Sequence, residues 1–241
     1  MEIDLWEIWE NMPLLVRGVV LVLTVQALAS IYVMIDRLIL LAVSGARSRK
    51  FAAEGGAKLA NNELEAALEI ARKHDKSHLA SFIETGIATF LARRKDGHSR
   101  AKAAEFTQRA LERKGENLSE SLNRGLSVLA STGSTAPFIG LLGTVLGILN
   151  AFRLIGEEAS GGMGTIGPAI AEALIVTGYG LLVAIPTVLL FNWLSGRITR
   201  YEASLANAGS ELVDQLEAGA GTEAKVVHEE RASAAFVEAV A

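Results

Sequence analysis

Residues 129–153 are the feature that most constrains what this chain can fold into. Their only charged side chain is Arg153, at the very end of the stretch. About 20 predominantly apolar residues are enough to cross ~30 Å of hydrocarbon as an α-helix. The stretch also carries glycine and hydroxyl side chains throughout, which a simple lipid anchor does not need. The pattern therefore predicts a membrane helix that packs closely against other helices and presents a polar stripe to them.

Two further apolar blocks, at residues 13–35 and 166–194, complete a set of three. Half of the 241 residues are hydrophobic, and the excess is concentrated in these blocks, which favours membrane helices over one large soluble core. We therefore expect an all-α integral membrane protein with three transmembrane helices and long helical extensions. The third block is longer than a span requires, so it should tilt or project into the interface.

The distribution of basic residues predicts the orientation. Residues 36–124 hold seventeen of the 23 Lys and Arg residues, whereas residues 1–12 hold none and are acidic. The positive-inside rule then places residues 1–12 and the loop at 154–165 outside, and the large middle region and the C-terminus in the cytoplasm. An acidic start also lacks the basic region of a cleaved signal peptide, so the first span should remain in the mature protein.

The cytoplasmic region, residues 36–128, reads as helical. Asn61 or Asn62 is a candidate cap for a helix that follows. A second helix is predicted by apolar residues three or four apart: Leu79, Phe82, Ile83, Ile87 and Phe90.

No strong stop signal precedes the second span. We therefore expect one long helix from about Ser99 into the membrane, weakened but not ended by Gly115 and Gly125. Residues 195–217 should extend the third span into the cytoplasm as a helix. The Ala/Gly/Glu-rich residues 218–241 are predicted to be a flexible tail.

Small side chains recur along the second and third spans. They suit close helix packing in lipid, and the packing candidates, with Pro186 added, are Gly140, Gly143, Gly147, Ala173, Gly180 and Pro186. Pro186 interrupts the hydrogen bonding of the third span and should bend it. Thr144 and Thr177 are open to two interpretations, because a threonine hydroxyl can line a polar pathway or bond back to its own helix.

Glu172 is the one acidic residue within the three predicted spans. Insertion scales place the cost of a charged side chain at a span centre at about 2.5–3.5 kcal/mol. Protonation, a wet interior or a basic partner would each relieve that cost. Because Glu172 lies near the outer end of its span, a structural acid at the interface is the alternative interpretation.

Several functional classes receive no support from the sequence. There is no cysteine. His74 and His78 are four residues apart and could share a helix face, but they form only an isolated pair, so we expect no metal site and no cofactor. The net charge of −4 does not suggest a nucleic-acid partner. No phosphate loop or nucleophile motif is present, and we do not expect an enzyme.

Two segments together resemble the ExbB/TolQ/MotA proton-channel family, and ExbB and TolQ more closely than MotA. Residues 135–152 are similar to the second membrane helix of that family, and residues 168–192 to the third. The resemblance implies a subunit of a bacterial inner-membrane motor, with a periplasmic N-terminus and a cytoplasmic C-terminus. It also implies that Thr144, Thr177 and Glu172 line the proton pathway, where Glu172 matches the acid just outside Thr177 on the third helix.

The same resemblance implies a set of partners. ExbB-like subunits form a homo-pentameric ring around a dimer of a single-span ExbD- or TolR-like protein, whose aspartate takes up protons as the coupling ion. A TonB- or TolA-like transducer then carries the work to the outer membrane. TonB-dependent uptake, Tol-Pal envelope maintenance and a gliding motor remain open. A non-conducting membrane scaffold is the rival from another class, whereas an ion-coupled transporter would need inverted repeats that three spans do not show.

Overall fold

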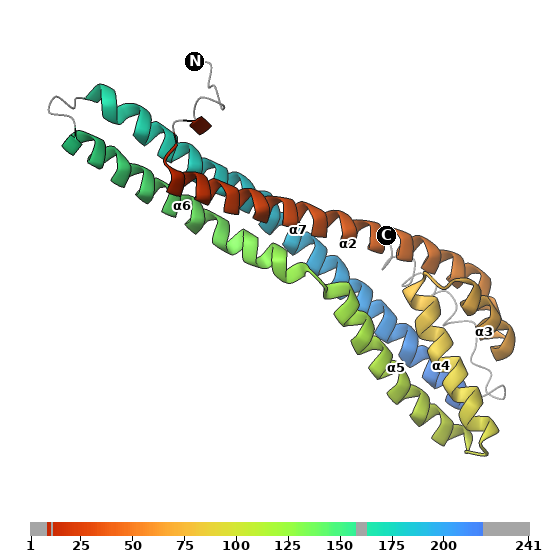
Figure 1. Cartoon of the computed structure of the whole chain (residues 1–241). Helices are drawn as coiled ribbons and strands as arrows, with labels where there is room; N and C mark the ends of the chain where they lie inside the picture. Colours follow the sequence, from red (N-terminus) through yellow and green to blue (C-terminus); the bar gives the residue numbers. More distant parts are fainter. Residues whose placement is uncertain (1–8, 11, 158–162, 219–241) are drawn as a thin grey trace. The chain divides into compact units, whose positions relative to one another are not determined.

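The computed structural model describes residues 9–10, 12–157 and 163–218 (Figure 1). The regular structure of this part consists of helices: α2 (Leu14–Ala60), α3 (Leu64–Lys73), α4 (His78–Lys95), α5 (Arg100–Asn123), α6 (Leu126–Glu157) and α7 (Met163–Ala218). Most of the predicted N-terminal segment 1–12, the centre of the loop at 154–165 and nearly all of the tail 218–241 lie outside the described residues.

Three helical stretches in the described part are long and apolar enough to cross a membrane: Leu14–Ala60, Arg100–Arg153 and Ile166–Ala218. The second stretch contains both α5 and α6. The all-helical prediction with three candidate spans is therefore confirmed for the described residues.

The chain divides into two compact units, with boundaries at Asp36/Arg37, Arg124/Gly125 and Leu194/Ser195. The first unit holds the start of α2, all of α6 and the first half of α7. The second holds the rest of α2, helices α3 to α5 and the end of α7. The predicted spans at residues 13–35, 129–153 and 166–194 all fall in the first unit.

The first unit has a narrow core and an apolar exterior. Its core is a strip of small and branched side chains from its three helices, together with Met12 just before α2: Met12, Val16, Val19, Leu23, Ala136, Val176, Val183 and Ala184. Large apolar side chains elsewhere on these helices are exposed, including Phe138 at 72% and Leu182 at 69%. Water would oppose such exposure, whereas lipid or a neighbouring apolar helix would not. This unit therefore has the surface of a membrane helix bundle.

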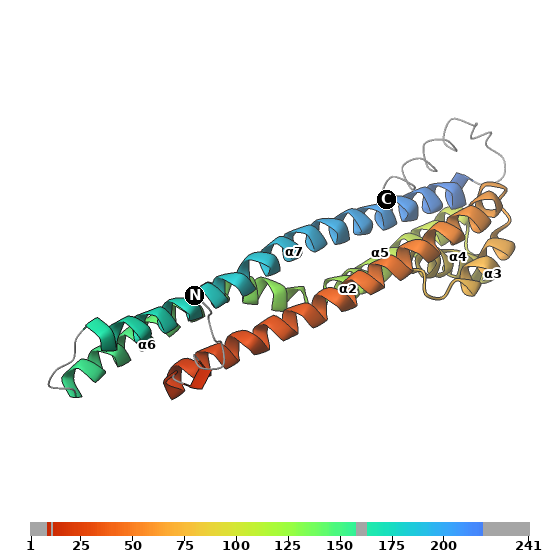
Figure 2. The same ribbon diagram turned by 90° about the horizontal axis from the view of Figure 1, so that it is seen from above.

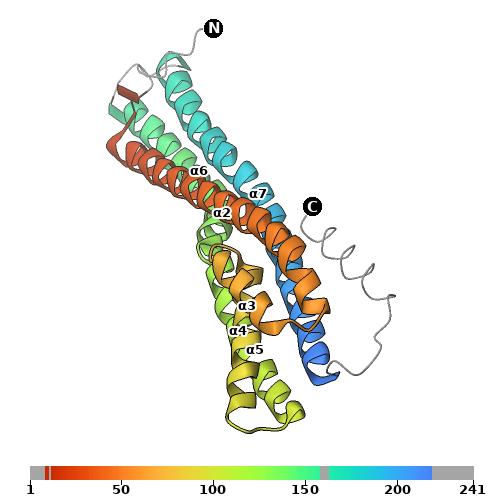
Figure 3. The ribbon, with the colours of Figure 1, turned by 90° about the vertical axis from the view of Figure 1, so that its right-hand side faces the viewer.

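The second unit has a conventional core built around α4, which lies beside α5 in two further views (Figures 2 and 3). The apolar stripe predicted for α4 is buried, with Phe82, Ile83, Ile87 and Phe90 each at most 4% exposed. Ser77 caps this helix by accepting a hydrogen bond from the Ala80 amide at 3.0 Å. Such a cap satisfies one of the amides that the first turn leaves unpaired.

A buried network of hydroxyl groups and one imidazole joins α2, α4 and α7 within the second unit. Ser44 Oγ lies 3.0 Å from His78 Nδ1 and 3.1 Å from Tyr201 Oη. Tyr201 Oη also lies 3.2 Å from Ser48 Oγ, which is 2.9 Å from Ser77 Oγ. Because each hydroxyl both donates and accepts, the network satisfies polar groups that would otherwise be costly to bury.

The electrostatic surroundings of His78 favour its neutral form. Burial lowers the pKa of His78 below the ordinary value of 6.5, and the positive charges of Lys114 and Arg37 lower it further. A protonated His78 ring would lose most of its hydration and would be repelled by these two cations. The network therefore holds a neutral histidine that faces Lys114 from α5, Arg37 from α2 and the Tyr201 ring from α7.

The long helix expected to run from Ser99 through the second span is instead two helices. Gly115 lies within α5, as predicted, but α5 ends at Asn123 and α6 begins at Leu126. Gly125 between them has a φ of +83°. This left-handed conformation is incompatible with a continuous α-helix and is readily adopted by glycine, so Gly125 ends the helix rather than merely weakening it.

Two local expectations for the cytoplasmic region also differ from the structure. Glu63, not Asn61 or Asn62, occupies the N-cap position of α3, and its side chain makes no capping hydrogen bond. Asn62 instead takes a positive φ of 58°, a turn conformation that asparagine tolerates. His74 ends α3 and His78 begins α4, so the two histidines do not share a helix face.

Candidate functional site

The site residues predicted from the sequence lie on α6 and α7, which touch through their backbones in the first unit. A methyl carbon added at Gly180 would lie 2.7 Å from the Ala136 carbonyl oxygen and 3.0 Å from Gly140 Cα. One added at Gly140 would lie 3.2 Å from the Cα atoms of both Gly180 and Thr177. No side chain fits between the helices at this point, and glycine is what allows the contact.

The contact continues along both helices in antiparallel order. A methyl carbon at Gly143 would clash with Val176, and one at Gly147 would lie 2.5 Å from Ala173 Cβ. Three pairs of positions therefore lie at the same height along the two helices: 140 with 177, 143 with 176, and 147 with 173. Gly140, Gly143, Gly147, Ala173 and Gly180 thus all lie in the α6/α7 contact.

Thr177 links the two helices directly. Its hydroxyl donates to the Gly140 carbonyl of α6 at 2.9 Å, and the side chain is half-buried. The Gly140 carbonyl oxygen is within reach of the Thr177 hydroxyl because the glycines let the two helices approach closely. The Thr177 hydroxyl oxygen also keeps lone pairs that can accept a hydrogen bond from a further donor.

Thr144 bonds within its own helix. Its hydroxyl donates to the Leu141 carbonyl at 2.7 Å, and the residue is 7% exposed. This is the back-bonding interpretation considered for a threonine inside a span. By the order of contacts between α6 and α7, Thr144 lies at about the level of Val176.

Glu172 is half-buried and lies beside Ala173 on α7. Within the described part of the chain it makes no hydrogen bond or ion pair. At a rise of about 1.5 Å per residue, Glu172 and Thr177 are roughly 7.5 Å apart along α7, with the level of Thr144 between them. The three residues thus occupy one short section of the bundle, although no hydrogen bond in the described part joins them.

Pro186 lies on the exposed side of α7, which continues through it. The neighbouring Thr187 is 5% exposed and donates to the Val183 carbonyl at 2.7 Å. This bond comes from a side-chain hydroxyl, whereas Pro186 itself has no amide hydrogen to donate to the Leu182 carbonyl.

The first span contributes polar contacts that the sequence analysis did not single out. Thr24 Oγ1 lies 3.1 Å from Tyr179 Oη of α7, and Gln26 Nε2 donates to Thr135 Oγ1 of α6 at 3.2 Å. Ser30 is 4% exposed. The sequence does indicate a polar contact here, because three polar residues within seven positions interrupt an otherwise apolar span. The partners of Thr24 and Gln26, however, depend on the packing of α2, which spacing alone does not give, and the Ser30 hydroxyl has no hydrogen-bond partner in the described part.

These observations define a class of protein. The chain is a membrane helix bundle in which two spans are locked by glycine contacts, hydroxyls line those contacts and a carboxyl without a partner in the described part lies beside them. Residues 74–207 match the MotA/TolQ/ExbB proton channel family, a segment that covers more than half of the chain. The chain therefore belongs to this family, as its resemblance predicted.

Individual relatives are similar over part of the chain. A biopolymer transport protein ExbB of Pseudomonas putida is 38% identical over 121 residues, which is 50% of this chain and 35% of the relative. An ExbB of Salmonella typhimurium is 37% identical over 109 residues, 45% of each chain. A Tol-Pal system protein TolQ of Pseudomonas aeruginosa is 47% identical over 78 residues, 32% of this chain and 34% of the relative. The chain thus matches less than half the length of each of these relatives.

Proposed function

We propose that this chain is a subunit of a proton-driven motor of the ExbB/TolQ type in a bacterial inner membrane. In this proposal it forms a homo-oligomeric ring, a pentamer, around a dimer of an ExbD- or TolR-like single-span partner. Proton flow through the ring drives a TonB- or TolA-like transducer that works on the outer membrane. The coupling ion is the proton, without a cofactor or covalent catalysis.

The observation that carries the proposal is the arrangement of polar groups on the α6/α7 pair. Thr144, Thr177 and Glu172 lie within about two turns of each other in a segment that is otherwise apolar. Polar and ionisable groups within a membrane are costly, and they most often serve an ion pathway. The family of the chain supports the same conclusion.

The chain does not supply a complete pathway by itself. Glu172 is the only acid in the three predicted spans, and it lies near one end of the third. A partner that brings its own carboxyl to the level of Thr144 and Thr177 would complete a relay. One proton crossing 100 mV releases about 2.3 kcal/mol, enough to shift a two-state equilibrium roughly fiftyfold. We therefore expect little proton uptake from this chain without its partner.

The orientation in this proposal follows the distribution of basic residues. Residues 36–124 and the segment after Leu194 are cytoplasmic, while the N-terminus and the loop between α6 and α7 are periplasmic. The exposed apolar side chains of the first unit then face lipid, neighbouring copies of the chain or the partner.

The test is proton uptake by liposomes that contain the chain together with its single-span partner, measured with a pH-sensitive dye. Thr177→Val should abolish uptake while the complex still co-purifies, and Thr177→Ser should restore it because the hydroxyl returns. Thr187→Val is the matched control, since Thr187 lies on the same helix and bonds only to its own backbone.

A scaffold without conduction is the second candidate. The hydrogen bond from Thr144 to its own helix favours it, because that hydroxyl is satisfied without a pathway. If liposomes that contain the chain and its partner take up no protons, and Thr144→Val, Thr177→Val and Glu172→Gln all leave growth unchanged, the motor proposal is wrong and the scaffold stands.

A further inference from the structure

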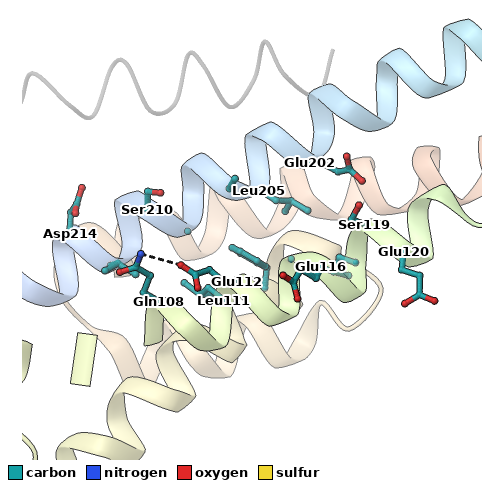
Figure 4. Close-up of a pocket in the computed structure, with 16 residues that line it drawn as sticks. Gln108, Leu111, Glu112, Glu116, Ser119, Glu120, Glu202, Leu205, Ser210 and Asp214 are labelled. Carbon is teal, nitrogen blue, oxygen red and sulfur yellow. Dashed lines mark hydrogen bonds between the residues drawn. The ribbon is translucent and has the colours of Figure 1, made fainter. Parts of the chain in front are cut away.

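A groove of about 760 Å³ lies between α5 and the end of α7 in the second unit (Figure 4). Its base is apolar, because Leu111, Leu118 and Leu205 are buried there. Gly209 of α7 deepens it, since a methyl carbon at this position would lie 2.7 Å from the Phe82 ring. The groove is separate from the α6/α7 contact and has no part in the proton pathway proposed above.

Carboxylates line both sides of this groove. One side carries three glutamates of α5, four residues apart, and the other carries two acids of α7 (Figure 4): Glu112, Glu116, Glu120, Glu202 and Asp214. Among the sixteen residues that line the groove there is no Lys, Arg or His. A groove with an apolar base and negative sides matches a segment that combines apolar and positively charged residues.

The acids of the groove differ from Glu105, the one acid of α5 that does not line it. Glu105 of α5 pairs with Lys102 and Arg109, which lower the pKa of its carboxyl. None of the ion pairs in the described part of the chain involves the five groove acids. Glutamates four residues apart also repel one another along a helix. Glu112 accepts a hydrogen bond from Gln108, and Glu202 accepts one from Asn123, so the partners of these two acids in the described part are neutral amides rather than cations.

The position of the groove indicates where a cationic segment would come from. Glu202 lies eight residues beyond Leu194, the end of the predicted third span, or roughly 12 Å along α7 at about 1.5 Å per residue. A single-span protein in the same membrane concentrates its Lys and Arg on the cytoplasmic flank of its span. In the orientation proposed above, that flank would emerge on the same side of the membrane as the groove.

We propose that this acidic groove binds the basic cytoplasmic flank of the single-span partner. The inference rests on the proposed function for the existence and the side of that partner. From Glu202 to Asp214 the groove extends roughly 18 Å along α7, which accommodates about five or six extended residues. Basic side chains of the flank meet the carboxylates, and apolar ones lie on Leu111, Leu118 and Leu205.

The chain has no cysteine, so single-cysteine variants report contacts without background. Ser210→Cys places a thiol in the groove, and Asn207→Cys places one on an exposed face of α7 outside it. Each variant is co-purified with a partner that carries one cysteine in its cytoplasmic flank and is then oxidised. We expect a disulfide between the two chains for Ser210→Cys and not for Asn207→Cys.

The charge of the groove is tested in the Ser210→Cys background. Glu116→Gln with Asp214→Asn should slow disulfide formation about tenfold at low salt, and the difference should shrink at high salt as screening increases. Glu211→Gln removes an exposed acid of α7 that does not line the groove and should leave the rate unchanged.

Three outcomes overturn the inference. One is equal cross-linking at both cysteines. Another is a Ser210→Cys disulfide only between two copies of this chain. The third is no cross-link although the partner co-purifies and proton uptake persists, which leaves the proposed function standing. If the partner neither co-purifies with the chain nor supports proton uptake, the proposed function is wrong, and the inference about the groove is then wrong as well.

Discussion

Replacing Gly180 by alanine should separate α6 from α7 and destabilise the first unit. The added methyl carbon would lie 2.7 Å from the Ala136 carbonyl oxygen, about 0.7 Å short of ordinary van der Waals contact at roughly 3.4 Å. Both this oxygen and Gly140 Cα, at 3.0 Å, are backbone atoms that cannot rotate away. The strain must therefore be relieved by moving one helix relative to the other.

The magnitude follows from two costs and one gain. Overpacking of a tight contact costs about 1–3 kcal/mol. Separation would also lengthen the 2.9 Å hydrogen bond from Thr177 to the Gly140 carbonyl, whose loss costs about 0.5–1.5 kcal/mol. Alanine in place of a helical glycine returns about 1 kcal/mol through helix propensity. The net destabilisation should therefore be on the order of 1–3 kcal/mol.

The matched control is Gly178→Ala, two residues earlier on the same helix. A methyl carbon at Gly178 meets no other atom within 4 Å, so this variant keeps the propensity gain without the steric cost. Unfolding free energies of the purified variants can be compared by titration with sodium dodecyl sulfate in mixed micelles, followed by circular dichroism. If Gly180→Ala proves as stable as Gly178→Ala, the close backbone contact between α6 and α7 does not exist in the folded protein.

Three further changes address the second unit and the break before α6. Burial and nearby cations hold the pKa of His78 below 6.5, so the unfolded chain binds a proton at this histidine more readily than the folded chain does. The unfolding free energy should therefore fall as pH drops below about 6.5. In urea titrations, the His78→Gln variant should lack this dependence of the unfolding free energy on pH. Gly125→Ala forces alanine to a φ of +83° and should cost about 1–2 kcal/mol, while Gly115→Ala should instead stabilise α5 by up to about 1 kcal/mol in the same thermal melts. Ser77→Ala removes the acceptor for the Ala80 amide and should cost about 1 kcal/mol; an unchanged melting temperature would argue against the cap.

The three spans were predictable because a membrane helix is recognised from consecutive residues of the sequence alone. A run of about 20 apolar residues is visible without knowing any partner, and the same holds for the stripe of α4, whose period predicts which face is buried. The small residues of α6 and α7 were also visible, because lipid-embedded helices use them for close approach. Sequence reasoning could therefore predict that the two helices pack closely.

The remaining features depend on geometry that spacing does not encode. Gly115 and Gly125 look alike in the sequence, but one continues a helix and the other takes a left-handed conformation that ends it. Likewise, Thr144 and Thr177 were equivalent candidates, yet one hydroxyl bonds to its own helix and the other to a neighbouring helix. The choice depends on which carbonyl lies within reach after packing, and that is a tertiary property.

The tight contact between α6 and α7 also limits how a proton could do work in the proposed motor. Backbone atoms at Gly140 and Gly180 already approach so closely that sliding of one helix past the other would produce clashes at several levels. Close-packed elements move as rigid bodies between discrete arrangements rather than deforming continuously. The pair therefore acts as one body, and protonation of a partner's acid has to shift the contact between this pair and the partner. Variants that loosen the pair, such as Gly180→Ala, should consequently weaken coupling more than they weaken assembly.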